Sequence, residues 1–93
     1  MANKYTNFTG DGSSDEVRVR GRTHIHGSGD FGGGTLKIEY KDPTNTWRDI
    51  FDADWTSAFD DVFDFTGHID TPIRATLTGA TNPNLHVDIR GGH

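Results

Sequence analysis

The sequence predicts an all-β fold, a single antiparallel β-sandwich of jelly-roll-like or immunoglobulin-like type with six to seven short strands. Several stretches alternate strictly between apolar and polar residues, which is typical of strands with one buried face. Clusters of Gly, Pro, Asn and Asp separate these stretches, as turns between antiparallel strands do. Because each strand has one apolar face, these faces must be covered by a second sheet or by closure of the first.

The chain has 93 residues, which suits one domain. We expect an N-terminal arm or short first strand over residues 1–15, the sandwich over residues 16–90 and a tail over residues 91–93. A hydrophobic fraction of 31% predicts a thin core, and the chain contains no cysteine that could add a disulfide. We therefore expect a homo-oligomer, in which neighbouring copies supplement the core.

The first half of the chain contains a weak strand signal over residues 4–9 and a strong one from Glu16 to His26. The strong signal alternates as a single strand. One face would carry Val17, Val19, Gly21, Thr23 and Ile25, and the other Arg18, Arg20, Arg22, His24 and His26. Five glycines in residues 27–34 then predict a loop.

A β-hairpin is predicted next. Thr35 to Lys41 alternates, Asp42 to Asn45 collects turn residues, and Trp47 resumes an extended run. We expect Tyr40 and Trp47 to be large anchors of the core.

The segment from Ile50 to Phe65 is ambiguous. Its aromatic residues recur every four positions, as on a helix, but several also fit the period of a strand. Seven aspartates and no Lys or Arg between Asp49 and Asp70 disfavour both a long strand and an isolated helix. We expect a loop with room for one helical turn near Thr56 to Asp61, and then a short strand from Val62 to Phe65.

Two further strands complete the predicted fold, joined by a loop over residues 80–84. Their inward side chains would be Ile73, Ala75, Leu77, Leu85, Val87 and Ile89.

Charge and hydropathy exclude two classes of partner. A net charge of −5 argues against direct nucleic-acid binding, which requires a basic surface. No apolar run approaches the roughly 18 residues of a membrane span, and the N-terminus does not lead into the apolar region of a signal peptide. We expect a protein made in a cytoplasm, with no membrane partner.

Possible metal sites are incomplete. His24 and His26 would project from one strand face, and His68 or His86 could complete a three-histidine site, but Gly27 to Asp30 follows where a cupin-like site has a glutamate. The run from Asp52 to Phe63 imitates a calcium loop, but it has Ser57 and Phe63 where that loop needs glycine and glutamate. We therefore expect no metal and no cofactor.

The chain also lacks the motifs of common enzymes. It contains no cysteine nucleophile and no Gly-x-Ser-x-Gly elbow. The glycine-rich residues 27–34 lack both the lysine and the following helix of a phosphate-binding loop. Paired aspartates occur, but pairs are expected by chance in so acidic a segment. We expect a protein that is not an enzyme.

Opposite charges instead indicate a surface that binds other protein chains. A row of arginines precedes the acidic and aromatic segment, and such patches can meet their complements on a neighbouring chain. Pairing of these charges across strands within one monomer is the alternative. The predicted partner-binding residues are Arg18, Arg20, Arg22, Asp52, Asp54, Trp55, Phe59, Asp60 and Asp61.

The strand and turn patterns resemble a known class of proteins. Gly34-Thr-Leu-Lys-Ile-Glu-Tyr, Trp47-Arg-Asp-Ile, Ile73-Arg-Ala-Thr-Leu-Thr-Gly and Leu85-His-Val-Asp-Ile together resemble the small β-sandwich structural proteins of tailed-bacteriophage virions, of the capsid decoration, cement or head-tail accessory type. The resemblance implies a non-enzymatic virion protein, made in the host cytoplasm, whose partners are the major capsid protein or neck and tail proteins.

The alternative is a carbohydrate-binding module or host-surface adhesion domain. Exposed Trp55 and Trp47 would stack on a sugar, and nearby aspartates would hydrogen-bond its hydroxyl groups.

Overall fold

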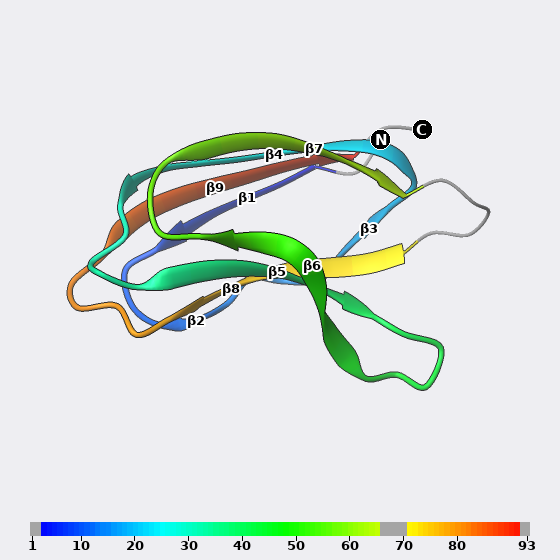
Figure 1. Ribbon diagram of the computed structural model, residues 1–93, viewed down its shortest axis with the longest axis horizontal. Helices are drawn as coiled ribbons and strands as arrows, with labels where there is room; N and C mark the ends of the chain where they lie inside the picture. Colours follow the sequence, from blue (N-terminus) through cyan, green and yellow to red (C-terminus); the bar gives the residue numbers. More distant parts are fainter. Residues whose placement is uncertain (1–2, 66–70, 92–93) are drawn as a thin grey trace.

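The computed structural model describes residues 3–65 and 71–91, without the side chains of residues 51 and 52. The predicted fold class is confirmed, since the structure is an all-β sandwich of two antiparallel sheets (Figure 1). The described residues form more strands than the six to seven predicted: β1 Asn3–Phe8, β2 Gly12–Ser13, β3 Val17–Val19, β4 Gly21–Asp30, β5 Thr35–Lys41, β6 Trp47–Trp55, β7 Phe59–Phe65, β8 Thr71–Thr78 and β9 Asn84–Gly91.

The order of the strands is that of a jelly roll. Sheet A runs β1-β9-β4-β7, and sheet B runs β2-β8-β5-β6, with β3 also paired to β8. If β2 and β3 are counted as two halves of one strand, this is the eight-stranded, double Greek-key arrangement. Of the two expected sandwich types, the strand order therefore supports the jelly roll. Figure 1 shows the two sheets as an upper and a lower layer.

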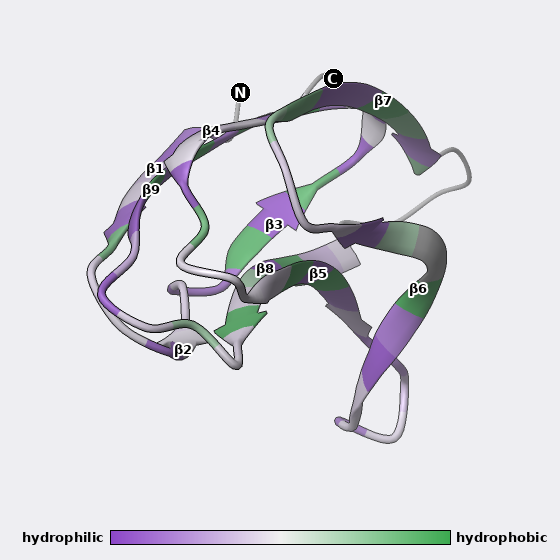
Figure 2. Cartoon of the chain, turned by 60° about the vertical axis from the view of Figure 1, so that its left-hand side comes forward, coloured by the Kyte–Doolittle hydropathy of each residue, from purple (hydrophilic) through white to green (hydrophobic). Residues whose placement is uncertain are grey.

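The core lies between the sheets and consists of the inward residues of the regular strands. The inward positions predicted on β8 and β9 are confirmed, because all six apolar side chains are at most 1% exposed. Leu36 and Ile38 of β5 are fully buried against them. Figure 2 shows apolar and polar stretches interleaved along these strands, as this alternation requires.

The prediction of one continuous strand from Glu16 to His26 is wrong. The expected single strand from Glu16 to His26 is divided at Arg20, so that β3 pairs with β8 in sheet B whereas β4 pairs with β7 and β9 in sheet A. Gly21 has a φ of 74°, which suits glycine and lets the chain turn from one sheet to the other. In Figure 1, β3 rises from the lower sheet toward β4.

The loop expected over residues 27–34 is shorter than predicted. Residues Gly27 to Asp30 extend β4 and pair with β9, and only residues 31–34 connect to β5. A side chain at Gly27 would place its Cβ 2.3 Å from the Phe59 ring. This glycine therefore serves close packing within the sheet rather than a loop.

The loop and helical turn expected between Ile50 and Asp61 are also wrong. Strand β6 continues to Trp55, residues 56–58 cross to the other sheet, and β7 begins at Phe59. The short strand expected over residues 62–65 is present as the end of β7. Pairing with β5 and β4 holds this acidic segment extended, and a bulge between Lys37 and Glu39 accommodates the irregular register of β6.

The β5–β6 hairpin has the predicted turn. The Asp42 carboxylate accepts hydrogen bonds from the Thr44 hydroxyl (2.6 Å) and from the backbone N–H groups of Thr44 and Thr46, and it pairs with Arg48. These interactions, of which the Thr44 hydroxyl bond is the largest, hold the pKa of Asp42 well below its ordinary value.

The two expected anchors differ in their surroundings. Tyr40 is partly buried and packs against the core. The prediction for Trp47 is wrong, because its ring lies on the outer face of sheet B under the Arg74 guanidinium (4.3 Å) and the Lys41 ammonium (5.0 Å). Trp47 is opposite Lys41 in the register, and this position of β5 faces outward.

Candidate functional site

The predicted arginine row is not a single row. Because the chain changes sheets at Arg20, Arg18 lies on the outer face of sheet B and Arg22 on the outer face of sheet A. Arg18 forms a long ion pair with Glu16 (3.8 Å) on its own side of the molecule. Inward and outward side chains do alternate within β3 and within β4, but the outward side chains of the two strands lie on different sheets.

The acidic segment is likewise divided. Asp54 is opposite Lys37 and faces outward from sheet B, whereas Asp60 is opposite His26 and faces outward from sheet A. These two carboxylates therefore cannot hold one calcium ion, and no group of three potential ligands suited to a metal occurs among the described side chains. The side chain of Asp52 lies outside the described part of the structure.

Several opposite charges pair within the monomer. Arg74 Nε lies 2.8 Å from Glu39 Oε1, Lys41 Nζ lies 3.0 Å from Glu16 Oε1, and Lys37 Nζ lies 3.6 Å from an oxygen of Asp49. The alternative of pairing across strands thus accounts for much of the charge on sheet B.

The two predicted aromatic residues belong to a larger group, which we call the aromatic seam: Trp55, Phe59, Phe63 and Phe65. The rings of Trp55 and Phe59 stack with centroids 3.7 Å apart and planes 3° apart. Phe63 meets Trp55 edge-on at 6.0 Å and lies 6.5 Å from Phe65. All four side chains are partly buried and pack against the core.

The aromatic seam lies where both sheets end. Strand β6 is an edge of sheet B and β7 is an edge of sheet A, and Figure 2 shows them on the same side of the molecule. Here a hollow of about 380 Å³ is lined by Tyr40, Ile50, Phe63, Asp64, Phe65 and Thr71. The core is thus covered on this side by partly exposed aromatic rings.

Carboxylates flank the aromatic seam along β7. Asp60 and Asp64 face outward from sheet A, while Asp61 is opposite the buried Ile25 and so lies on the inner side of the strand. Asp61 is nevertheless exposed because β7 is at the edge, and its carboxylate accepts a hydrogen bond from the Val62 N–H (2.8 Å). The seam is therefore apolar with an acidic margin.

The outer face of sheet A forms a second polar surface. His24 and His26 project from it as expected, and both imidazoles approach the Asp60 carboxylate. Tyr5 of β1 is 59% exposed, stacks on His86 at 5.9 Å and shares a hydrogen bond with that imidazole.

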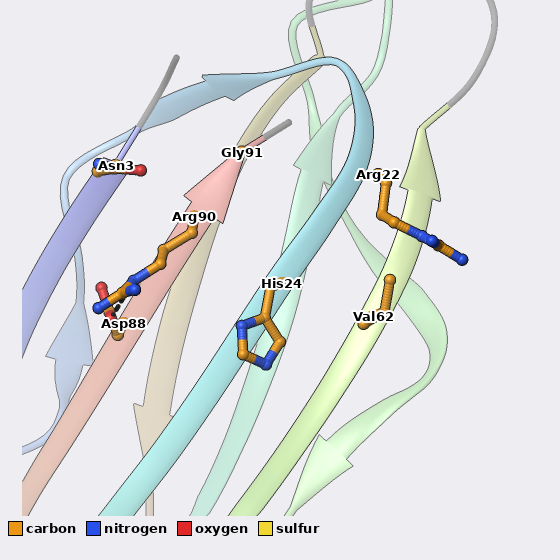
Figure 3. A pocket seen from close by; sticks show the side chains of 7 residues that line it. All are labelled: Asn3, Arg22, His24, Val62, Asp88, Arg90 and Gly91. Carbon is orange, nitrogen blue, oxygen red and sulfur yellow. Dashed lines mark hydrogen bonds and ion pairs between the residues drawn. The ribbon is translucent and has the colours of Figure 1, made fainter. Parts of the chain in front are cut away.

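A hollow on this face surrounds His24. Figure 3 shows Arg90 leaning toward Asp88, to which its Nε donates a hydrogen bond (2.8 Å), and Arg22 extending over β7 beside Val62. His24 is engaged by Asp60, and the described residues form no three-histidine group of the kind considered from the sequence. His68, the other histidine considered, lies outside the described residues.

The sequence analysis did not place Phe63 and Phe65 of the seam, or Tyr40 and Ile50 of the hollow beside it, on a common surface. The signal was present, because Phe59, Phe63 and Phe65 share one face if residues 59–65 are a strand. The aspartates between them favour a loop instead.

Comparison with protein-family models, with curated proteins and with solved structures finds no match to this chain. No helix among the residues described here is long and apolar enough to cross a membrane.

Proposed function

We propose that this protein is a non-enzymatic structural protein of a tailed-bacteriophage virion, where it decorates or cements the capsid by binding shell proteins and neighbouring copies of itself. The observation that carries the proposal is the aromatic seam with its acidic margin. The seam lies on the side of the sandwich where the edge strands β6 and β7 are found, which we call the open side. Neck and tail proteins of the virion are further partners of the same class.

The chemistry of the seam is that of a protein-binding surface. Aromatic residues are enriched at interfaces, and they contribute much of the binding energy when a partner removes the remaining water from them. The rings of the seam are already held in place by mutual stacking and by the core, so that little side-chain entropy is lost on binding. Their charged margin would select among partners.

The fold is compatible with the proposal. Jelly rolls occur in viral capsid proteins and in lectins, so this support is an analogy of fold and not of site. The resemblance of the strand and turn patterns to virion proteins points in the same direction as the seam.

The test is the native mass of the species that contains this chain when it is isolated gently from its source. We expect either a homo-oligomer or co-sedimentation with a particle, and the association with the particle should be lost when Phe63→Asp is introduced into the seam. A species of 10.3 kDa at all concentrations, with no particle association, would exclude the proposal.

A carbohydrate-binding or adhesion domain is the second candidate, with a different aromatic group from Trp47 and Trp55 as its contact. The Trp55 ring is covered by Phe59, and the Trp47 ring by Arg74 and Lys41. The exposed aromatic group is instead Tyr5 with His86 on the outer face of sheet A. Binding on a glycan array that is lost in Tyr5→Ala would favour this candidate, whereas no binding on a broad array would remove it.

A further inference from the structure

We infer that the open side of the sandwich binds an extended, basic segment of a partner protein, which adds as a strand to the free edge of β7 and places its apolar side chains over the aromatic seam. This inference rests on the proposed function and names the kind of segment that a virion partner would supply.

The backbone of β7 provides the first requirement. It is seven residues long and, among the described strands, pairs on one side only, with β4. An edge strand presents N–H and C=O groups that a further strand can bind, and peptides are recognised in this way in several protein classes.

The side chains of β7 provide the second requirement. Its inner side carries Phe63 and Phe65 beside the hollow, with Asp61 before them, and its outer side carries Asp60 and Asp64. A strand laid against this edge would place apolar residues opposite the phenylalanines and Lys or Arg opposite the carboxylates. The complementary segment therefore alternates between basic and apolar residues.

The same features disfavour a second copy of this chain as the occupant. Two β7 strands paired in antiparallel fashion would bring the carboxylates of Asp60, Asp61 and Asp64 toward one another, and like charges across a strand pair are destabilising. Within the described residues, Arg18 lies in a strand of three residues and Arg22 in a strand that is already paired on both sides. The basic segment is therefore assigned to another protein.

The other edges of the described sheets are less suitable. The register of β6 is broken by the bulge opposite β5. Strand β1 points Lys4 inward toward Asp15 (2.9 Å), and β2 has two residues. Inward charges, bulges and short strands protect sheet edges from further pairing. Asp61 is also an inward charge, but it is exposed and precedes Phe63 and Phe65, so that the apolar residues of a partner strand can still lie over these two rings.

The experiment uses the full chain and a synthetic peptide, acetyl-Lys-Val-Lys-Val-Lys-Val-Lys-amide, with a fluorescent label. The control peptide has the same composition with the lysines and valines in two blocks, which keeps the charge and removes the alternation. We expect fluorescence anisotropy to show binding at least about tenfold tighter for the alternating peptide, and hydrogen exchange to show protection of β7 amides on binding.

Matched variants separate the seam from general charge attraction. Asp60→Asn with Asp64→Asn should weaken binding by about tenfold, whereas Asp49→Asn with Asp54→Asn, which removes the same charge from sheet B, should leave it within about twofold. Equal binding of both peptides, an equal loss in both double variants, or exchange protection outside β7 would overturn the inference. None of these outcomes alters the native mass, so the proposed function is tested separately.

Discussion

The sandwich has two sides at which both sheets end, and they are covered in different ways. On the side of β1, β2 and β3, Phe8 is 5% exposed and Ser14 is 8% exposed. The Ser14 hydroxyl accepts a hydrogen bond from the Ala75 N–H (2.9 Å), and the Asp11 carboxylate accepts hydrogen bonds from the N–H groups of Gly79 (3.0 Å) and Ala80 (2.9 Å). This side is sealed by a buried ring and by bonds to the backbone of β8 and of the residues that follow it.

On the side of β6 and β7, the cover is the aromatic seam. Its rings stay partly exposed, and the carboxylate of Asp61 occupies an inner position of the edge strand without a basic partner among the described residues. The first side is therefore sealed, whereas the second leaves apolar surface partly exposed. Three variants test this difference, and a fourth tests a residue that lies away from both sides.

The largest effect is expected for Phe8→Ala on the sealed side. Removing a buried ring from a packed core should lower the free energy of unfolding by about 3–5 kcal/mol. Urea denaturation followed by circular dichroism measures this loss. A loss no greater than that of Phe63→Ala would contradict the difference between the two sides.

Ser14→Ala should have the next largest effect, a loss of about 1–3 kcal/mol, because the buried Ala75 N–H would lose its bond to the hydroxyl. The same denaturation assay applies. Ser28→Ala on the outer face of sheet A is the matched control and should change stability by less than about 0.5 kcal/mol.

Phe63→Ala tests the seam. Because this ring is only partly buried, its removal should cost about 1–2 kcal/mol, less than for a fully buried phenylalanine. If the isolated chain loses as much stability as in Phe8→Ala, the seam is part of the core and not a surface kept for binding.

The smallest effect is expected at Glu39, on the outer face of sheet B and away from both sides. Burial opposes its ionisation, but the hydrogen bonds from Thr76 (2.6 Å) and Arg74 (2.8 Å) prevail and lower its pKa below 4.5. Its ionisation therefore stabilises the folded state above pH 4.5, and this stabilisation is lost as the pH falls through the lowered pKa.

Glu39→Gln should consequently reduce stability by about 1 kcal/mol at pH 7 and by less at pH 3. Denaturation at both pH values measures the difference. An equal loss at the two values would show that ionisation of Glu39 does not contribute to stability.

Several parts of this description could be predicted from the sequence. Alternation over residues 35–41, 73–78 and 85–89 correctly placed the inward residues of the regular strands, because side-chain direction in a strand depends only on the local period of two. The turn at Asp42 was also predictable, since its hydrogen bonds involve residues within six positions of it.

The candidate site was only partly predictable. The structure brings Trp55 and Phe59 together, but it divides the predicted arginines and aspartates between the two sheets. Both predictions assumed that neighbouring residues stay in one sheet, and the chain changes sheets at Arg20 and again between Trp55 and Phe59.

The sequence by itself determined that this chain forms strands with one apolar face and one polar face, and hence a sandwich, because burial of those faces is required whatever the order of the strands. The local pattern does not say which strands are edges, where the chain crosses between sheets or that the aromatic residues of β6 and β7 meet in one seam. These features depend on pairing between residues distant in sequence, such as Gly27 with Phe59, and no local pattern encodes such pairing.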